Sequence, residues 1–263
     1  MPVARPRLRK APLVGAFFVL LAWLPPAPAD NCTAPPDDAA LVKVRYVHDG
    51  DTLSLSDNTR VRLIGINTPE LARDGEPAQP LAIRARDHLR QMLFRTGNRV
   101  RLLAGEERLD QHGRTLAYLW LPDGKDITAE LLAAGLGWLV AIPPDTRFLD
   151  CHSEAETRAR NAQRGVWKPG VYDALPSATL GLRTSGFQRV RGRITRVNHG
   201  GGATWINLQG RFAVRIPDAD LHEFAAPPTS TWVGRELEAR GWVYQTRGEL
   251  RVNIGHPANL LLF

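Results

Sequence analysis

The stretch from residue 47 to residue 70 constrains the fold of this chain most, because two short runs of apolar residues flank a turn. Residues 53–55 alternate apolar and polar side chains, and residues 61–66 are mostly apolar. Between the two runs stand Asp57 and Asn58. Such residues tolerate left-handed backbone geometry and hydrogen-bond to their own main chain. Two runs around a short turn predict a β-hairpin.

The open end of this hairpin gathers polar residues. If the hairpin is centred near residue 59, Asp51 lies opposite Asn67. Thr68 and Glu70 then come to the same end, and Arg62 lies on the second strand. Oxygen atoms of such residues suit a hard cation such as calcium, and an arginine beside the cation suits a phosphate. The alternative is a polar hairpin end with surface ion pairs, because similar acidic turns occur in many surface hairpins.

Three ordered motifs resemble the staphylococcal nuclease (thermonuclease) family. They are DGDT at residues 49–52, RLIGINTPE at residues 62–70 and DQHGRTLAY at residues 110–118. The similarity runs from about residue 42 to residue 167. It implies the family's fold, a five-stranded oligonucleotide/oligosaccharide-binding (OB) barrel with three helices. It also implies the family's activity, metal-dependent hydrolysis of phosphodiester bonds in DNA and RNA by an endonuclease.

The resemblance assigns a metal site to the acidic turn. A calcium ion would be held by Asp51, Asn67 and the main-chain carbonyl of Thr68. Asp49 would support the ion indirectly, through these ligands and without contacting the ion itself. The family usually has aspartate where this chain has Asn67. An amide oxygen can still ligate calcium, but one negative charge is lost. We therefore expect weakened metal binding, and another divalent ion could serve.

The resemblance also assigns catalytic roles. Glu70 would orient the attacking water or accept its proton, and Arg62 and Arg114 would bind the charged phosphate of the transition state. His112 stands where family members keep a phosphate-binding tyrosine, and it would contact a terminal phosphate. Structural alternatives exist: Arg62 could lie over its strand neighbours, Arg114 could pair with Asp110, Glu70 could cap a loop, and His112 could be an exposed turn residue.

A second departure from the family concerns residues 138–143. The founding member carries tyrosines there that hold the nucleotide, whereas this chain has Ala141, Ile142 and Pro143. The contacts to the base and to a terminal phosphate therefore differ, and the family's substrate length cannot be carried over.

Residues 1–29 have the pattern of a secretory signal peptide. A basic segment is followed by an apolar run at residues 11–24 and by the Ala-x-Ala sequence of residues 27–29. An uncleaved membrane anchor is the alternative, but the run is shorter than the roughly 20 residues of a spanning helix. We expect a periplasmic or secreted protein without stable membrane insertion after cleavage. In such a protein Cys32 and Cys151 would form a disulfide, with two buried free thiols as the alternative.

The net charge of +7 is unevenly distributed. Residues 1–29 carry four basic and no acidic groups, so the mature chain would be near +3. The part from residue 171 onward has 11 arginines, no lysines and 7 acidic residues. The basic excess therefore belongs to the C-terminal part and says little about the hairpin.

Periodicity places further elements before residue 168. Strands are expected at residues 43–46, 98–103 and 115–121, with helices at residues 80–94, 127–134 and 147–164. Ala155, Ala159 and Ala162 would face the core from the last helix. With the hairpin, this order predicts a mainly β (α+β) fold with one OB barrel.

A second, smaller OB-like barrel is expected in the C-terminal part. Its pattern predicts three strands at residues 188–197, 204–208 and 212–216, a short helix at residues 218–224, and two strands at residues 236–244 and 250–254. Candidate nucleic-acid contacts are cations for phosphates and aromatic rings for bases. They are Arg191, Arg193, Arg196, Trp205, Trp242 and Tyr244. The alternative is that the tryptophans belong to the core and the arginines to the solvated surface.

These patterns divide the chain into a signal peptide (1–29), a lead-in (30–40), a nuclease-like domain (41–168), a linker (169–186) and an OB-like domain (187–263). We expect a monomer that acts on DNA and RNA. Two other functions remain open. One is a non-catalytic nucleic-acid-binding protein on the same scaffold, and the other is an interaction module of the cell envelope.

Overall fold

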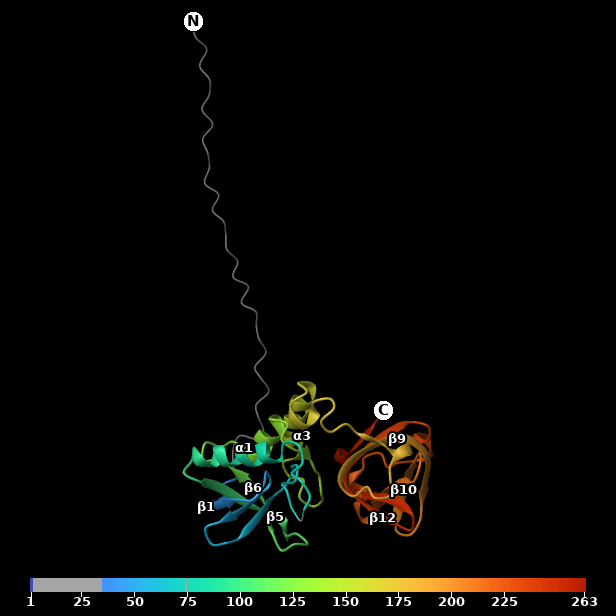
Figure 1. Ribbon diagram of the computed structural model, residues 1–263, viewed down its shortest axis with the longest axis horizontal. Coiled ribbons are helices and arrows are strands. Elements are labelled where there is room, and N and C mark those ends of the chain that lie inside the picture. The colour runs from blue at the N-terminus through green and yellow to red at the C-terminus, as the bar shows by residue number, and fades with distance from the viewer. Residues whose placement is uncertain (2–34, 74) are drawn as a thin grey trace.

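The computed structural model describes residue 1, residues 35–73 and residues 75–263. In these residues the chain forms two closed β-barrels that lie side by side, the first drawn mainly in blue to green and the second in orange to red (Figure 1). This mainly β architecture with accompanying helices confirms the expected fold class. The predicted signal peptide falls on residues 1–29, which except for residue 1 lie outside the described residues.

The strands of the first barrel close in the order β1-β2-β3-β6-β5. Neighbours are antiparallel except β3 and β6, which run parallel. Leu53, Val61 and Val100 point inward and are fully buried, so side chains fill the barrel. The bounds are β1 Ala40–Val47, β2 Thr52–Leu55, β3 Arg60–Leu63, β5 Arg99–Leu109 and β6 Thr115–Trp120.

The hairpin forms, but its expected centre near residue 59 is wrong. Thr52 pairs with Arg62, which centres the hairpin at residue 57. The turn is short because Asn58 adopts the left-handed conformation (φ 72°), and the Leu55 N–H donates to the carbonyl of Thr59 over 2.9 Å. Asp51 consequently lies beside Leu63 and not opposite Asn67.

Asn67 approaches Asp51 by another path. After β3 the chain turns at Gly65, whose φ is +86° and where a Cβ would lie 2.5 Å from the ring of His152. Strand β4 (Ile66–Asn67) then pairs with β7 (Trp138–Leu139). This second turn brings Asn67 and Thr68 back to the acidic turn, so the two ends meet through a tertiary pairing and not through the hairpin register.

The helices α1 (Ala82–Phe94), α2 (Ile127–Ala133) and α3 (Leu149–Asn161) pack on the core of the first barrel. Helix α1 begins two residues later than expected because Leu81 is left-handed (φ 69°). On α3, Ala155 and Ala159 are buried as expected. The prediction for Ala162 is wrong, because the helix ends before it and its side chain is exposed.

The second barrel repeats the strand order of the first. Its strands close as β9-β10-β11-β13-β12, with β12 pairing back to β9 and with β11 and β13 parallel. The expected short helix is the 3-10 turn η3 (Asp218–Glu223). The sequence pattern did not indicate β14, which pairs with β12. The bounds are β9 Gly186–His199, β10 Ala203–Leu208, β11 Phe212–Pro217, β12 Glu236–Thr246, β13 Glu249–Asn253 and β14 Leu260–Leu262.

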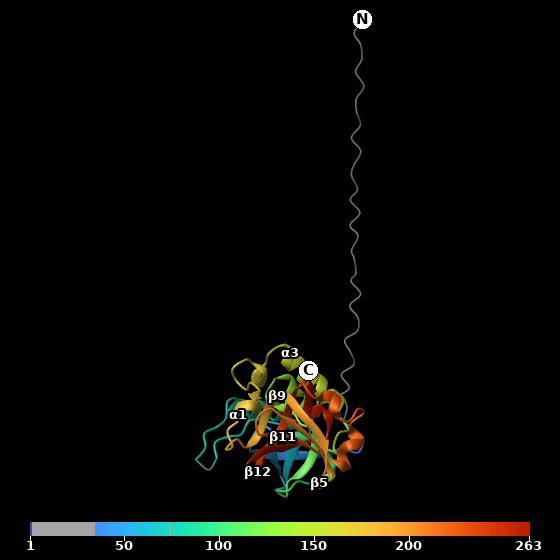
Figure 2. The ribbon, with the colours of Figure 1, turned by 90° about the vertical axis from the view of Figure 1, so that its right-hand side faces the viewer.

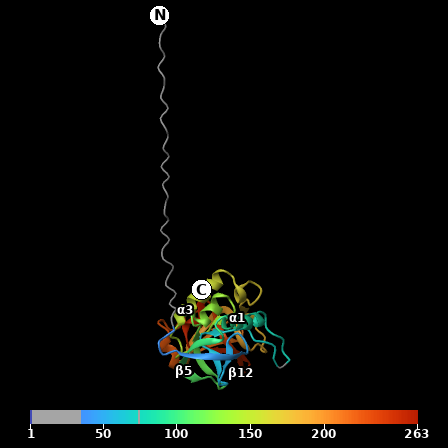
Figure 3. The same ribbon diagram turned by 90° about the vertical axis from the view of Figure 1, so that its left-hand side faces the viewer.

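The two barrels are joined by buried polar contacts. Arg240 of β12 donates to Glu156 of α3 over 2.7 Å, and the other oxygen of Glu156 accepts the Leu139 N–H over 2.6 Å. The side-chain amide of Asn259 bonds to the main-chain N–H and carbonyl of Ala141. Figures 2 and 3 view the molecule from opposite sides, with the second and the first barrel in front, respectively. Because a buried charge that loses its partner destabilises the fold, these contacts fix the relative position of the two barrels.

The segment between the barrels is partly ordered by pairing. Strand β8 (Leu175–Pro176) runs parallel to β9, and the Tyr172 hydroxyl donates to the carbonyl of Pro80. Cys151 is buried on α3, whereas Cys32 lies outside the described residues, so the disulfide stays a prediction. In the part of the chain that the structure describes, every helix is too short or too polar to cross a membrane.

Candidate active site

Asp51 stands at the centre of a buried polar network in the first barrel. Its carboxylate accepts the N–H and the hydroxyl of Thr68 over 2.7 and 2.9 Å, and the hydroxyl of Thr52 over 3.0 Å. Gly50 permits this packing, because a Cβ there would lie 2.8 Å from the Thr68 side chain. The acidic turn is thereby held against the residues that follow β4.

Arg62 extends from β3 into the same network. Its guanidinium lies 3.3 Å from Asp51 Oδ1, donates to Asn67 Oδ1 over 3.3 Å, and donates to the Leu63 carbonyl over 2.8 Å. The side chain is 11% exposed. It is therefore a positioned charge and not a solvated strand arginine, and it contacts two of the three expected metal-ligating residues.

Arg114 approaches from the turn before β6. Its Nε donates to Asp110 Oδ2 over 2.6 Å, and its Nη1 donates to the Thr52 hydroxyl over 3.2 Å. Burial alone would raise the pKa of Asp110, but hydrogen bonds from Arg114 and from the His112 N–H hold that pKa below its usual value. The pairing with Asp110, which the sequence offers as the structural alternative for Arg114, is present, and the same guanidinium also contacts Thr52 in the network around Asp51.

Arg62, Arg114 and His112 line one cavity of about 440 Å³. They come from the strand β3 and the turn before β6, which are neighbours because β3 and β6 pair in parallel. Trp242 of the second barrel completes the wall. From the sequence, Trp242 is only a candidate contact within the second domain, because no local pattern shows which distant segment docks beside a site.

The main chain of Glu70 is held by Gln79. Its N–H donates to the side chain of Gln79, and its carbonyl accepts the Gln79 N–H, each over 2.9 Å. Partial burial and the nearby Asp51 carboxylate raise the pKa of Glu70, while Arg62 and Arg114 act in the opposite direction. The glutamate thus shares an electrostatic environment with both arginines.

Asp49 lies on the inner side of the acidic turn, where its Oδ1 accepts the N–H of Asp51 over 3.0 Å. Burial raises the pKa of Asp49 to about 7, and the Asp51 carboxylate adds to the effect while Arg62 opposes it. Two carboxylates therefore stand close together at one turn.

The chemistry of these side chains fits a hard divalent cation. The oxygens come from Asp51, Asn67 and the Thr68 carbonyl, and no soft ligand belongs to the set. Among the described residues, no group of three or more His, Cys, Asp or Glu residues is arranged for metal binding.

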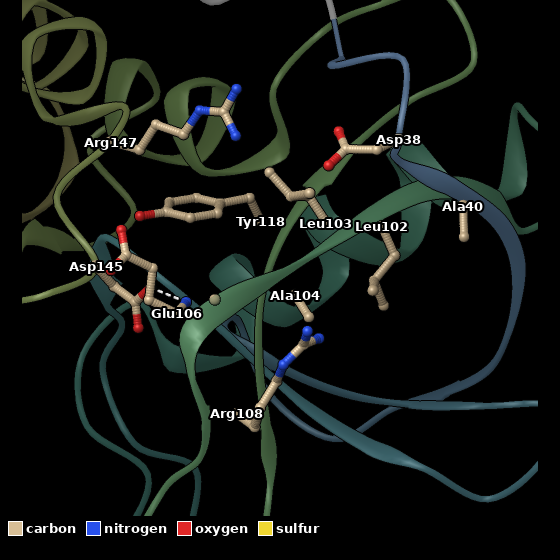
Figure 4. A pocket seen from close by; sticks show the side chains of 11 residues that line it. Asp38, Ala40, Leu102, Leu103, Ala104, Glu106, Arg108, Tyr118, Asp145 and Arg147 are labelled. Carbon is tan, nitrogen blue, oxygen red and sulfur yellow. Dashed lines mark hydrogen bonds between the residues drawn. The ribbon is translucent and has the colours of Figure 1, made fainter.

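A second cavity of about 510 Å³ is lined largely by residues of β5 (Figure 4). Asp145 and Arg147 line it with Tyr118, and a hydrogen bond of 2.7 Å joins the Glu106 N–H to Asp145. Gly105 allows this contact, because a Cβ there would meet the Asp145 carboxylate at 2.7 Å. Asp145 therefore ties the segment around residue 145 to β5. This cavity has its own arginines, Arg108 and Arg147, but neither Arg62 nor Arg114 lines it.

Comparison with known proteins supports the family suggested by the motifs. Residues 60–169 match the model of the staphylococcal nuclease homologue family. The thermonuclease of Staphylococcus intermedius is 35% identical over 128 residues, 48% of this chain and 74% of the relative. The thermonuclease of Staphylococcus hyicus is 33% identical over 129 residues, with the same shares. The SPbeta prophage-derived endonuclease YokF of Bacillus subtilis is 28% identical over 128 residues, 47% of this chain and 43% of that protein.

Proposed function

Because the chain belongs to the staphylococcal nuclease family, we propose that it is a calcium-dependent endonuclease that hydrolyses phosphodiester bonds of DNA and RNA. The observation that carries the proposal is the network that joins Arg114, Thr52, Asp51, Arg62 and Asn67 without a break beside the cavity. A binding scaffold that had lost catalysis would not need this arrangement.

Hydrolysis of a phosphodiester requires an activated water and relief of negative charge on the phosphate oxygens. Arg62 and Arg114 converge on the cavity from two elements and supply charge-assisted hydrogen bonds to a phosphate. Glu70 is an oxygen acceptor near both arginines, and it orients the water or accepts its proton.

Asp51, Asn67 and the Thr68 carbonyl are the residues that would hold the cation. A bound divalent cation would offset phosphate charge. Asp49 supports the turn through its hydrogen bond to the Asp51 N–H. In the described structure Arg62 already contacts Asp51 and Asn67, so the arginine and the ligand oxygens are positioned together.

Export is part of the same proposal. It rests on the signal-peptide pattern of residues 1–29 and on the expected pairing of Cys32 with Cys151. Fractionation of the native host, with detection of the processed chain outside the cytoplasm, tests export. Thiol titration of the unfolded, unreduced chain tests the disulfide, and two titrating thiols per chain would exclude it.

The central experiment compares the purified mature chain with Glu70→Ala. Single-stranded and plasmid DNA are incubated with calcium or with chelator, and the products are separated by size. We expect calcium-dependent cleavage that is lost in the variant by a factor of about 10² to 10³. Binding of DNA without cleavage in several divalent ions would instead favour the non-catalytic binding protein. Absence of any salt-sensitive DNA binding would favour the envelope interaction module.

A further inference from the structure

Trp242 is the second barrel's contribution to the cavity that holds the arginines. It lies on β12 and is 45% exposed, whereas the other residues of the cavity wall belong to the first barrel. An exposed indole beside two arginines offers a flat apolar surface where a phosphate-bearing ligand would enter.

Contacts with both barrels fix the position of this indole. Arg240, two residues earlier on the same face of β12, is bound to Glu156 of the first barrel. The ring of Phe187 packs edge-on against Trp242 with 5.3 Å between centroids, and it lies 5.3 Å from the ring of Trp138. The exposed part of Trp242 is therefore held at the cavity and does not swing freely.

Aromatic and basic side chains continue from Trp242 across the outer face of the second barrel. Tyr244 points to the same face of β12 and pairs with Arg251 of β13. The guanidinium of Arg251 lies 4.6 Å over the ring of Trp205 on β10, and that of Arg215 lies 5.9 Å from the same ring. We call these five residues the aromatic-basic row: Trp242, Tyr244, Arg251, Arg215 and Trp205.

The alternate residues of these strands show that the row faces outward. Val243, Val252, Val214 and Ile206 are buried inside the barrel, with exposures of 4% or less. From β12 to β10 the row crosses three strand spacings, which amounts to roughly 15 Å. OB barrels bind single strands over about 4 to 16 nucleotides, and this span suits the short end of that range.

The charge of the row suits a polyanion. Arg215 pairs across the sheet with Trp205 and with Asn253, both neutral residues, and its acidic neighbour is Asp220. Arg251 has one acidic neighbour, Glu249, at 3.0 Å. By contrast, Arg191 on β9 is bound to Glu236, and Arg189 is bound to Glu238. The cations over the ring of Trp205 are therefore Arg215 and Arg251, whereas Arg191 lies 4.2 Å over the ring of Phe263. The nucleic-acid contacts expected of Arg193 and Arg196 stay predictions.

We propose that the aromatic-basic row binds a single strand of nucleic acid, with an unpaired base stacked on Trp242 next to the phosphate held by Arg62 and Arg114. This inference rests on the proposed nuclease function for the role of the cavity. A base inside a duplex presents no free face to a protein ring, so the row selects unpaired nucleotides. The second barrel is then part of the substrate site and not a separate appendage.

Binding without cleavage tests the row. Fluorescence anisotropy in chelator measures the affinity of a labelled 12-nucleotide single strand, an abasic strand of the same length and a blunt hairpin duplex. Trp242→Ala should weaken binding of the normal strand about tenfold and leave the abasic strand and the duplex unchanged. Trp242→Phe should restore most of the affinity, because a ring remains. Phe94→Ala removes an even more exposed aromatic residue, on α1, and should change nothing.

The arginines give an independent measurement. Arg215→Ala should reduce the slope of log affinity against log salt for the single strand by roughly 0.7, the value for one lost phosphate contact. Arg95→Ala removes an exposed arginine at the end of α1, away from the row, and should leave the slope unchanged. If Trp242→Ala fails to fold by circular dichroism, the salt slope of Arg215→Ala still decides the question.

The two proposals fail in different ways. The proposal for the row would be overturned if the wild type, Trp242→Ala and Arg215→Ala had the same single-strand affinity and the same salt slope. This holds even if calcium-dependent cleavage persists. A loss of duplex binding as large as that of the single strand would also overturn it. If the wild type does not cleave but Trp242→Ala still loses single-strand affinity about tenfold, binding by the row is supported and the proposed nuclease function is excluded.

Discussion

The two barrels share one strand order, yet the turn before the second strand differs between them. In the first barrel this turn contains Asp49 and Asp51 and leads into Thr52, whereas in the second barrel residues 200–203 are three glycines and Ala203, followed by Thr204. The first turn bonds to Thr68 and Arg62, and the second turn offers no carboxylate. The pairing order thus specifies the barrel, while a few turn residues specify the charge network.

The outer face of the second barrel, unlike its turn, carries charged and aromatic side chains. The second barrel carries aromatic rings and arginines on β10 to β13, and its turn is neutral. The contact of Arg240 with Glu156 places that face beside the charged cavity of the first barrel. A catalytic turn and a flat binding face are therefore combined by docking, and each barrel can be altered separately to test this division.

Among the variants that separate the two barrels, Arg114→Lys should have the largest effect on turnover. It removes a planar contact to the phosphate and leaves the second barrel unchanged. Lysine keeps the charge but cannot contact Asp110 and Thr52 as the planar guanidinium does. We expect the turnover number for single-stranded DNA to fall about 10²-fold while KM changes little. Arg247→Lys, at an exposed turn of the second barrel, is the matched control, with activity expected within about twofold. An equal loss in both variants would contradict the division between the barrels.

Arg240→Met should disturb the docking of the two barrels. It leaves the Glu156 carboxylate buried without the guanidinium that contacts it over 2.7 Å. Removing one partner of a buried ion pair costs roughly 3–5 kcal/mol, so we expect a lower denaturation midpoint and faster proteolysis between the barrels. The double variant Glu156→Gln/Arg240→Met should recover much of the loss, because glutamine retains an oxygen for the Leu139 N–H. No recovery would show that the charge of Glu156 does not cause the instability.

The contrast between the barrels also shows what sequence patterns can predict. Strand and helix positions follow from local periodicity and turn residues, and most of them agree with the structure within a few residues. The hairpin register was displaced because the left-handed Asn58 closes a shorter turn than the polar residues alone suggest. The meeting of Asp51 with Thr68 was expected for the wrong reason, since β4 and β7 bring it about.

Contacts between the barrels could not be predicted from local patterns. Asn259 bonds to Ala141 across 118 positions, and Arg240 reaches Glu156 across 84 positions. Neither pair has a periodic or motif signal in the sequence. The place of Trp242 in the cavity wall depends on these contacts, and only the tertiary structure shows it.

Asn67→Asp should sharpen the difference between the two turns by adding a third carboxylate to the first. The new charge lies where Asn67 Oδ1 now accepts from Arg62, so it strengthens both the ion pair and the ligand set. We expect the calcium concentration for half-maximal binding to fall roughly tenfold. Calorimetry measures it directly, and cleavage assays measure it independently. Asn198→Asp on β9 adds the same charge to the second barrel and should leave calcium binding unchanged. Equal or weaker calcium binding in Asn67→Asp would exclude this residue as a ligand.

His112→Ala should have the smallest effect. The imidazole lines the cavity beside Arg114, but it is exposed, and the structural hydrogen bond of this residue runs from its N–H to Asp110. Alanine keeps that N–H, so the turn and the position of Arg114 should persist. We expect KM for single-stranded DNA to rise about two- to fivefold with the turnover number retained, because an exposed polar contact contributes little. A loss of turnover as large as that of Arg114→Lys would show that the histidine acts in the chemical step, and the first barrel would then use three cationic or polar groups around the phosphate where the geometry indicates two.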